Sequence, residues 1–194
     1  MLAHSCAASA AQHEAKQLLH MRSKPGTSTA SGIRGAYESL GVQGFYAAHG
    51  HEYVNPHDDQ IVKAIALLMD SQQFGEQPGQ LRVLDLSCGS GEAYERRTGR
   101  SAHGWSFQNI ADGCLAARSF DLCVCSFALH LCDSSSLFIT LYQLACHCRW
   151  LAILAPHKQP AIREEHGWSA AEAWKVDRVH VRLYASLNFG QPLE

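Results

Sequence analysis

The chain has 194 residues, of which 46% are hydrophobic, and this suits one domain with a buried core. Its formal net charge of −2 excludes the strong basic field by which proteins bind nucleic acid or anionic membranes, and no apolar run approaches the ~20 residues of a membrane span. Its eight cysteines lack the regular spacing of a disulfide scaffold, so we expect free thiols in a reducing compartment, the cytoplasm.

The first 31 residues differ in composition from the rest of the chain. They are rich in Ala, Ser and His, and Glu14 is their single acid. The run SKPGTSTASG at 23–32 is typical of a flexible linker. We therefore expect a flexible tail over 1–31 and one α/β domain over 32–194. The basic, acid-poor leader also fits an organelle transit peptide, which is the alternative to a cytoplasmic location.

Two later segments have the pattern of amphipathic helices. The first, DQIVKAIALLMDSQ, follows an Asn-Pro turn, and Asp58 can cap its amino end. The second, SSSLFITLYQLACHC, can be capped by Asp133 or by a following serine. In the first helix the apolar residues fall at helical spacing and predict a buried stripe of Ile61, Ala64, Ile65 and Leu68.

Short apolar runs separated by helices predict the strands. The tail at 177–188 alternates, with Val179, Val181 and Leu183 on one face, which indicates an antiparallel strand near a sheet edge. This order indicates an α/β fold with a Rossmann-like, doubly wound and mostly parallel sheet. Its parallel strands are predicted at 82–87, 104–109, 120–126 and 149–155.

In such sheets ligands bind beyond the carboxyl ends of the strands. The turn Cys88–Gly91 and the segment Ser126–His130 each follow a predicted strand, so both belong to the same rim. The chain has no Gly-x-Ser-x-Gly nucleophile motif and no phosphate loop ending in Gly-Lys-Ser/Thr. We therefore predict a ligand site at this rim, with neither a nucleophilic serine motif nor a phosphate-binding loop.

The stretch RVLDLSCGSGE places an acid, Asp85, at a strand end and a Gly-x-Gly turn at Gly89 and Gly91. A dinucleotide fingerprint requires a third glycine, but position 94 is Tyr. The combination instead resembles motif I of the class I S-adenosylmethionine-dependent methyltransferases. Glycines there let the backbone approach the cofactor closely. The alternative interpretation is a glycine-rich turn in which Asp85 serves as a cap.

Other segments extend the resemblance over about 41–188. FDLCVCSFALHL looks like the fourth strand of these enzymes, and RWLAILAPHK looks like the strand that follows it. GFYAAHGHEYVNPH is similar to an aromatic segment that, in one branch of the family, often closes over the cofactor.

The resemblance implies S-adenosylmethionine as cofactor and an acceptor of unknown identity. No catalytic residue is indicated, because many methyl transfers need only alignment and desolvation, although a rim histidine can serve as a base. For each histidine the alternative is a hydrogen-bonded loop residue, and for each tyrosine it is packing. The implied cofactor residues are Tyr46, Asp85, Ser87, Cys88, Gly89, Ser90, Gly91, Asn109, Ser126 and Phe127. The implied substrate rim is His130, His157 and Tyr53, with His49, His51 and His57 as further rim candidates.

The stretch between Gly91 and Phe120 is short, at 28 residues. A βαβ unit needs about 30 residues or more, so there is room for one helix and one short strand, and one strand–helix unit is expected to be missing. The acid that would bind the cofactor ribose then has no clear position, because Asp112 has the character of a turn residue. By resemblance, Asn109 lies at the exit of the third strand and faces the adenine.

The shortened core predicts impaired cofactor binding. The alternative function is therefore a non-catalytic, methyltransferase-like module that binds a protein partner. Several cysteines, at 123, 125, 132, 146 and 148, also suggest a zinc site, but none is spaced as Cys-x₂-Cys. We expect buried free thiols and no metal.

Overall fold

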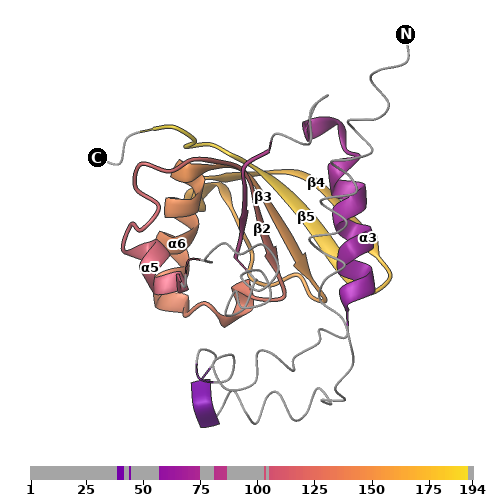
Figure 1. The fold of residues 1–194 in the computed structure, drawn as a ribbon, viewed down its shortest axis with the longest axis horizontal. Helices are drawn as coiled ribbons and strands as arrows, with labels where there is room; N and C mark the ends of the chain where they lie inside the picture. The colour runs from indigo at the N-terminus through magenta and orange to yellow at the C-terminus, as the bar shows by residue number, and fades with distance from the viewer. Residues whose placement is uncertain are drawn as a thin grey trace.

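The computed structural model describes residues 39–41, 44, 57–74, 81–86, 103 and 105–191. These residues form an α/β fold in which one mixed sheet carries helices on both faces (Figure 1). No helix within these ranges is long and apolar enough to cross a membrane.

The sheet has five strands in the order β1-β2-β3-β5-β4. The first three strands are parallel to one another, whereas β5 is antiparallel to both β3 and β4. The predicted parallel strands near 83, 120 and 149 and the antiparallel strand of the tail are thereby confirmed. The strands are β1 Val83–Asp85, β2 Phe120–Ser126, β3 Cys148–Ala155, β4 Trp168–Val176 and β5 Val179–Ser186.

Helix α3, Asp58–Met69, covers one face of the sheet, and α5, Phe107–Ala111, and α6, Ser134–His147, cover the other (Figure 1). His57 and Asp133 occupy the amino-terminal cap positions of α3 and α6, and neither makes a side-chain cap hydrogen bond. Asp58 is thus the first residue of α3 rather than its cap. Three short 3₁₀ helices complete the described elements: η1 Gln72–Phe74, η3 Leu129–Leu131 and η4 Glu164–His166.

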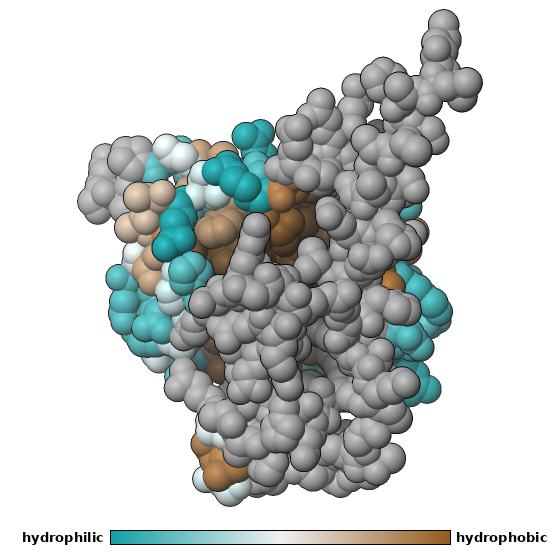
Figure 2. Space-filling model, viewed as in Figure 1, coloured by the Kyte–Doolittle hydropathy of each residue, from teal (hydrophilic) through white to brown (hydrophobic). Residues whose placement is uncertain are grey.

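Alternation along the strands divides the core into two layers. The predicted stripe of α3 is buried and packs on the strand residues that point toward it. These include the alternating side chains of β5, Val179, Val181 and Leu183, all of which are buried. The intervening strand residues, such as Cys123 and Ile153, pack under α6. In the view of Figure 2, hydrophobic side chains gather over the middle of the described part and hydrophilic ones lie along its margins.

The strand predicted at 104–109 is wrong, because residues 107–111 form helix α5. A capping box begins that helix: Ser106 Oγ accepts from the Asn109 N–H at 3.2 Å, and Asn109 Oδ1 accepts from the Ser106 N–H at 2.9 Å. These local bonds satisfy donors that a strand would need a neighbour to satisfy. Among the described residues, β1 consequently has one neighbour, β2, and forms an edge of the sheet. Residues 87–102, where a further unit would begin, lie outside the described part.

Candidate functional site

The carboxyl ends of β1, β2 and β3 meet at one edge of the sheet. β1 ends at Asp85, which pairs with Val124, and β2 ends at Ser126, which pairs with Leu154 of β3. Asp85 is exposed and Ser126 is buried. The ends of β1 and β2 thus lie at one edge, as predicted, whereas the turn Cys88–Gly91 lies outside the described residues and the binding roles of the rim residues stay predictions. This edge is where ligands bind in open α/β sheets.

Phe127 turns the chain at the end of β2. Its φ of 57° lies in the left-handed region, which bulky residues rarely adopt and which costs on the order of 1–3 kcal/mol. Its N–H donates to the carbonyl of Leu154 at 2.8 Å, and its ring stacks on His57 with centroids 4.9 Å apart. The hydrogen bond thus ties the turn to the end of β3, and the stacking places the ring beside the start of α3.

Two predicted rim histidines lie together. The rings of His130, in η3, and His157, which follows β3, meet edge to face with centroids 5.3 Å apart. Desolvation, and then the neighbouring His157, lower the pKa of His130. His130 is consequently neutral at pH 7, and a neutral imidazole can accept a proton.

Some predicted site residues are not at a strand end, or fall outside the described part of the chain. Asn109 lies in α5, and its side-chain oxygen accepts from both the N–H and the Oγ of Ser106. The strand exit assigned to Asn109 is therefore wrong, and its contact with adenine stays a prediction. The residues outside the described ranges are Tyr46, His49, His51, Tyr53, Ser87, Cys88, Gly89, Ser90 and Gly91.

The cysteines of the central strands belong to the core. Cys123, Cys125 and Cys148 are free, buried thiols in the layer under α6. Burial, and then the charge of Asp85, raise the pKa of Cys125 to about 12, and burial also raises the pKa of Cys123. Protonated thiols are poor nucleophiles and metal ligands. Within the described ranges, no group of three His, Cys, Asp or Glu residues is placed to hold a metal ion.

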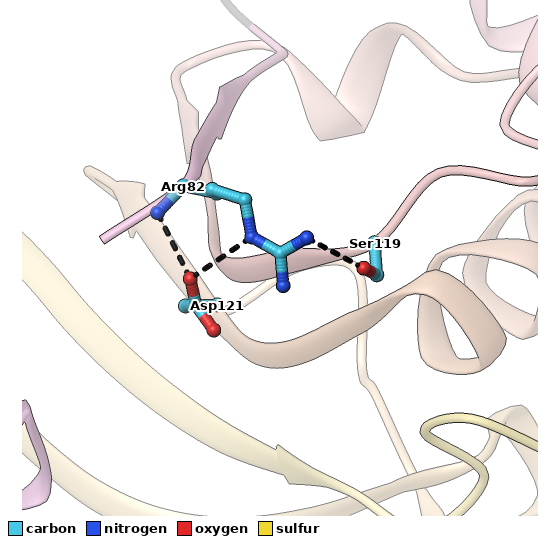
Figure 3. A network of polar contacts seen from close by, with 3 residues as sticks. All are labelled: Arg82, Ser119 and Asp121. Carbon is cyan, nitrogen blue, oxygen red and sulfur yellow. Dashed lines mark hydrogen bonds and ion pairs between the residues drawn. The ribbon is translucent and has the colours of Figure 1, made fainter. Parts of the chain in front are cut away.

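A polar network fixes the opposite end of β1 (Figure 3). Asp121 Oδ2 accepts from the backbone N–H of Arg82 at 2.9 Å and lies 3.5 Å from its Nε, while Arg82 Nη1 donates to Ser119 Oγ at 2.8 Å. The network joins the start of β1 to the start of β2 and so positions Asp85 three residues later. The sequence alone did not indicate it, because 39 positions separate Arg82 from Asp121.

Known proteins that resemble the chain include a relative in sequence and several solved structures. No family model matches the chain. The uncharacterized protein C17A5.05c of Schizosaccharomyces pombe is 40% identical over 119 residues, which cover 50% of this chain and 47% of that protein. The chain thus matches about half the length of this relative.

The solved structures that are similar share little sequence with the chain. Magnesium protoporphyrin IX methyltransferase from Synechocystis PCC 6803 with bound SAM has a TM-score of 0.42 and 17% identity, covering 84% of this chain and 98% of that one. The N-methyltransferase NodS from Bradyrhizobium japonicum WM9 has a TM-score of 0.45 and 14% identity, covering 68% and 88%. An O-methyltransferase family protein from Burkholderia thailandensis has a TM-score of 0.47 and 13% identity, covering 91% and 71%. Similarity at this level does not assign an activity.

Proposed function

We propose that the protein is an S-adenosylmethionine-dependent methyltransferase whose cofactor lies along the rim formed by β1 and β2. The observation that carries this proposal is the parallel pairing of the two strands, which brings Asp85 to the edge where β2 ends in Ser126 and Phe127. The Gly-x-Gly turn follows Asp85 directly in the sequence. An acid and a second strand end thus lie at the edge where such folds bind ligands, and the glycine turn follows that acid in the sequence.

The rim residues support methyl transfer to oxygen or nitrogen. When bound, the cofactor supplies an electrophilic methyl group on a sulfonium. Asp85 can accept hydrogen bonds from its ammonium, directly or through water, and the glycines leave room for it. His130 and His157 lie on the side toward β3, and the neutral His130 can take the proton that an acceptor hydroxyl or ammonium loses.

A second candidate is a non-catalytic module that binds a protein partner. It is favoured by the exposure of β1, which has three residues, one described neighbour and a side chain, Val83, that is 50% exposed. The sequence after Gly91 also offers no clear ribose acid. An open strand edge is a surface on which another chain can pair.

Calorimetric titration with S-adenosylmethionine separates the two functions. We expect the wild type to bind, Asp85→Ala to bind about tenfold more weakly, and Gly91→Val not to bind, because a larger side chain fills the cofactor's path. Asp59→Ala, in an exposed position of α3, is the matched control and should bind as the wild type does.

Circular dichroism would check that every variant is folded. Equal binding by the wild type and Gly91→Val would refute the assignment of the turn. Absence of binding by the folded wild type would refute the enzyme and favour the partner-binding module.

A further inference from the structure

A hollow of about 310 Å³ lies next to the rim, between the loop that follows β3 and the β4–β5 hairpin. Its walls include Lys158 and Ile162 from the loop and His180, Arg182 and Tyr184 from β5. His180 pairs with Ala155, the last residue of β3, and Lys158 directly follows His157. The hollow therefore opens beside the carboxyl end of β3, on the His157 side of the rim.

The charged groups at this hollow are all cationic. Lys158 and Arg182 line it beside the ring of His180, and Lys175 pairs with His180 on the neighbouring strand. No carboxylate forms an ion pair with Lys158, Lys175 or Arg182 in the described part of the chain. Desolvation and the charges of Lys175, Lys158 and Arg182 lower the pKa of His180. The local potential is thus positive although the chain as a whole carries a net charge of −2.

Hydrogen bonds hold the guanidinium of Arg182 in place, and two of its nitrogen atoms remain without an acceptor. Its Nη1 donates to the carbonyls of Lys158 at 2.7 Å and Pro160 at 3.0 Å, which fixes the guanidinium beneath the loop. Its Nε and Nη2 are buried and have no hydrogen-bond partner. Buried donors of a cation without a partner or counter-ion are unfavourable, and the charge of an anion in the hollow would offset that cost.

The hollow also has the volume to hold a small anionic group. Its volume is at the lower end of the range for such pockets, about 300–1,000 Å³, and Ile162 and Tyr184 give it apolar contact surface. We propose that it binds a carboxylate or phosphate group of the methyl acceptor, so that the rest of the acceptor extends toward His157 and the rim. This inference rests on the proposed methyltransferase function for the identity of the ligand, and on the hollow itself for the binding of an anion.

The test uses inorganic phosphate and acetate as probes, each compared with chloride at equal ionic strength. The readout is the ring resonance of His180, which NMR identifies by its disappearance in His180→Gln. We expect a saturable shift and a higher His180 pKa when the anion binds, since an anion favours the protonated ring. The probe that binds more tightly tells whether the acceptor carries a phosphate or a carboxylate.

Two variants test whether Arg182 and Lys158 bind the anion, and a third controls for the loss of a positive charge elsewhere. Arg182→Gln should weaken binding of the probe about tenfold or more, because a charge-assisted hydrogen bond is lost. Lys158→Gln should also weaken it, and it removes only an exposed side chain, so the fold is preserved. Arg149→Gln is the matched control, because it removes the same charge at the start of β3, the end opposite to the hollow. There Arg149 stacks on Phe189. It should bind the probe as the wild type does.

A shift that does not saturate, or that is equal in the wild type and both variants, would overturn the inference. Calorimetry with S-adenosylmethionine keeps the two proposals apart. Binding of the probe without binding of the cofactor would refute the methyltransferase and leave an anion site. Binding of the cofactor without binding of either probe would leave the methyltransferase and refute the anion site.

Discussion

The two sides of the sheet differ in how firmly they are built. β1 has three residues and pairs with one described strand, whereas β3 and β5 have eight residues each and lie between two neighbours. Val83 of β1 is 50% exposed, while Val179 of β5 is fully buried. The side of β3 and β5, which holds the cationic hollow, therefore contributes most to the stability of the fold. The side of β1, which is predicted to hold the cofactor, contributes less stability. Changes near β1 can consequently alter binding without unfolding the protein.

A matched pair of valine substitutions measures this difference. Val179→Ala should lower the free energy of unfolding by about 2–3 kcal/mol, because it removes buried methyl groups and leaves a cavity under α3. Val83→Ala should change it by less than about 0.5 kcal/mol. Urea denaturation followed by circular dichroism gives both values. Equal losses would mean that β1 is as well packed as β5.

Breaking the polar network at the start of β1 should lower the free energy of unfolding by an intermediate amount. Asp121→Ala should lower the free energy of unfolding by about 1 kcal/mol, because the backbone N–H of Arg82 loses its acceptor along with a partly exposed ion pair. The control is Glu165→Ala, which removes a more exposed pair with Arg163 and should have almost no effect. Urea denaturation compares the two. If Asp121→Ala is also silent, the network does not anchor β1.

The smallest expected effect concerns His130 and pH. The pKa of His130 is lowered in the folded protein, so the unfolded chain binds more protons as the pH falls below about 6.5. The stability contributed by the neutral ring is complete above that pH and is lost as the pH falls through the folded pKa. His130→Gln should therefore lose less stability than the wild type between pH 7.5 and pH 5, as measured by urea denaturation. The same loss in both proteins would contradict the prediction.

Periodicity made the elements on the well-packed side predictable. The stripe of α3 and the alternation of β5 appear in the sequence because each element buries one face. The parallel order of β1, β2 and β3 followed from apolar runs separated by helices, and this placed Asp85 and Ser126 on one rim. Burial leaves a pattern along the chain, so a fold stabilised by burial can be inferred from it.

The remaining features depend on contacts that leave no such pattern. β4 is mostly exposed and its residues do not alternate between buried and exposed, so no strand was predicted there. Helix α5 has five residues and depends on one capping box, which is too short for a helical period to show. The cationic hollow joins Lys158 to Arg182 across a hairpin, and only the folded chain brings them together.

Phe127 shows where backbone geometry and side-chain packing favour different residues. Backbone geometry alone would favour glycine at its left-handed position, because glycine has no Cβ to clash there. The chain instead keeps a large aromatic ring, which stacks on His57 and packs against the core beside α3. The contacts of the ring therefore outweigh the strain of the backbone, and homologues with the same packing are expected to keep an aromatic residue where backbone geometry alone would favour glycine.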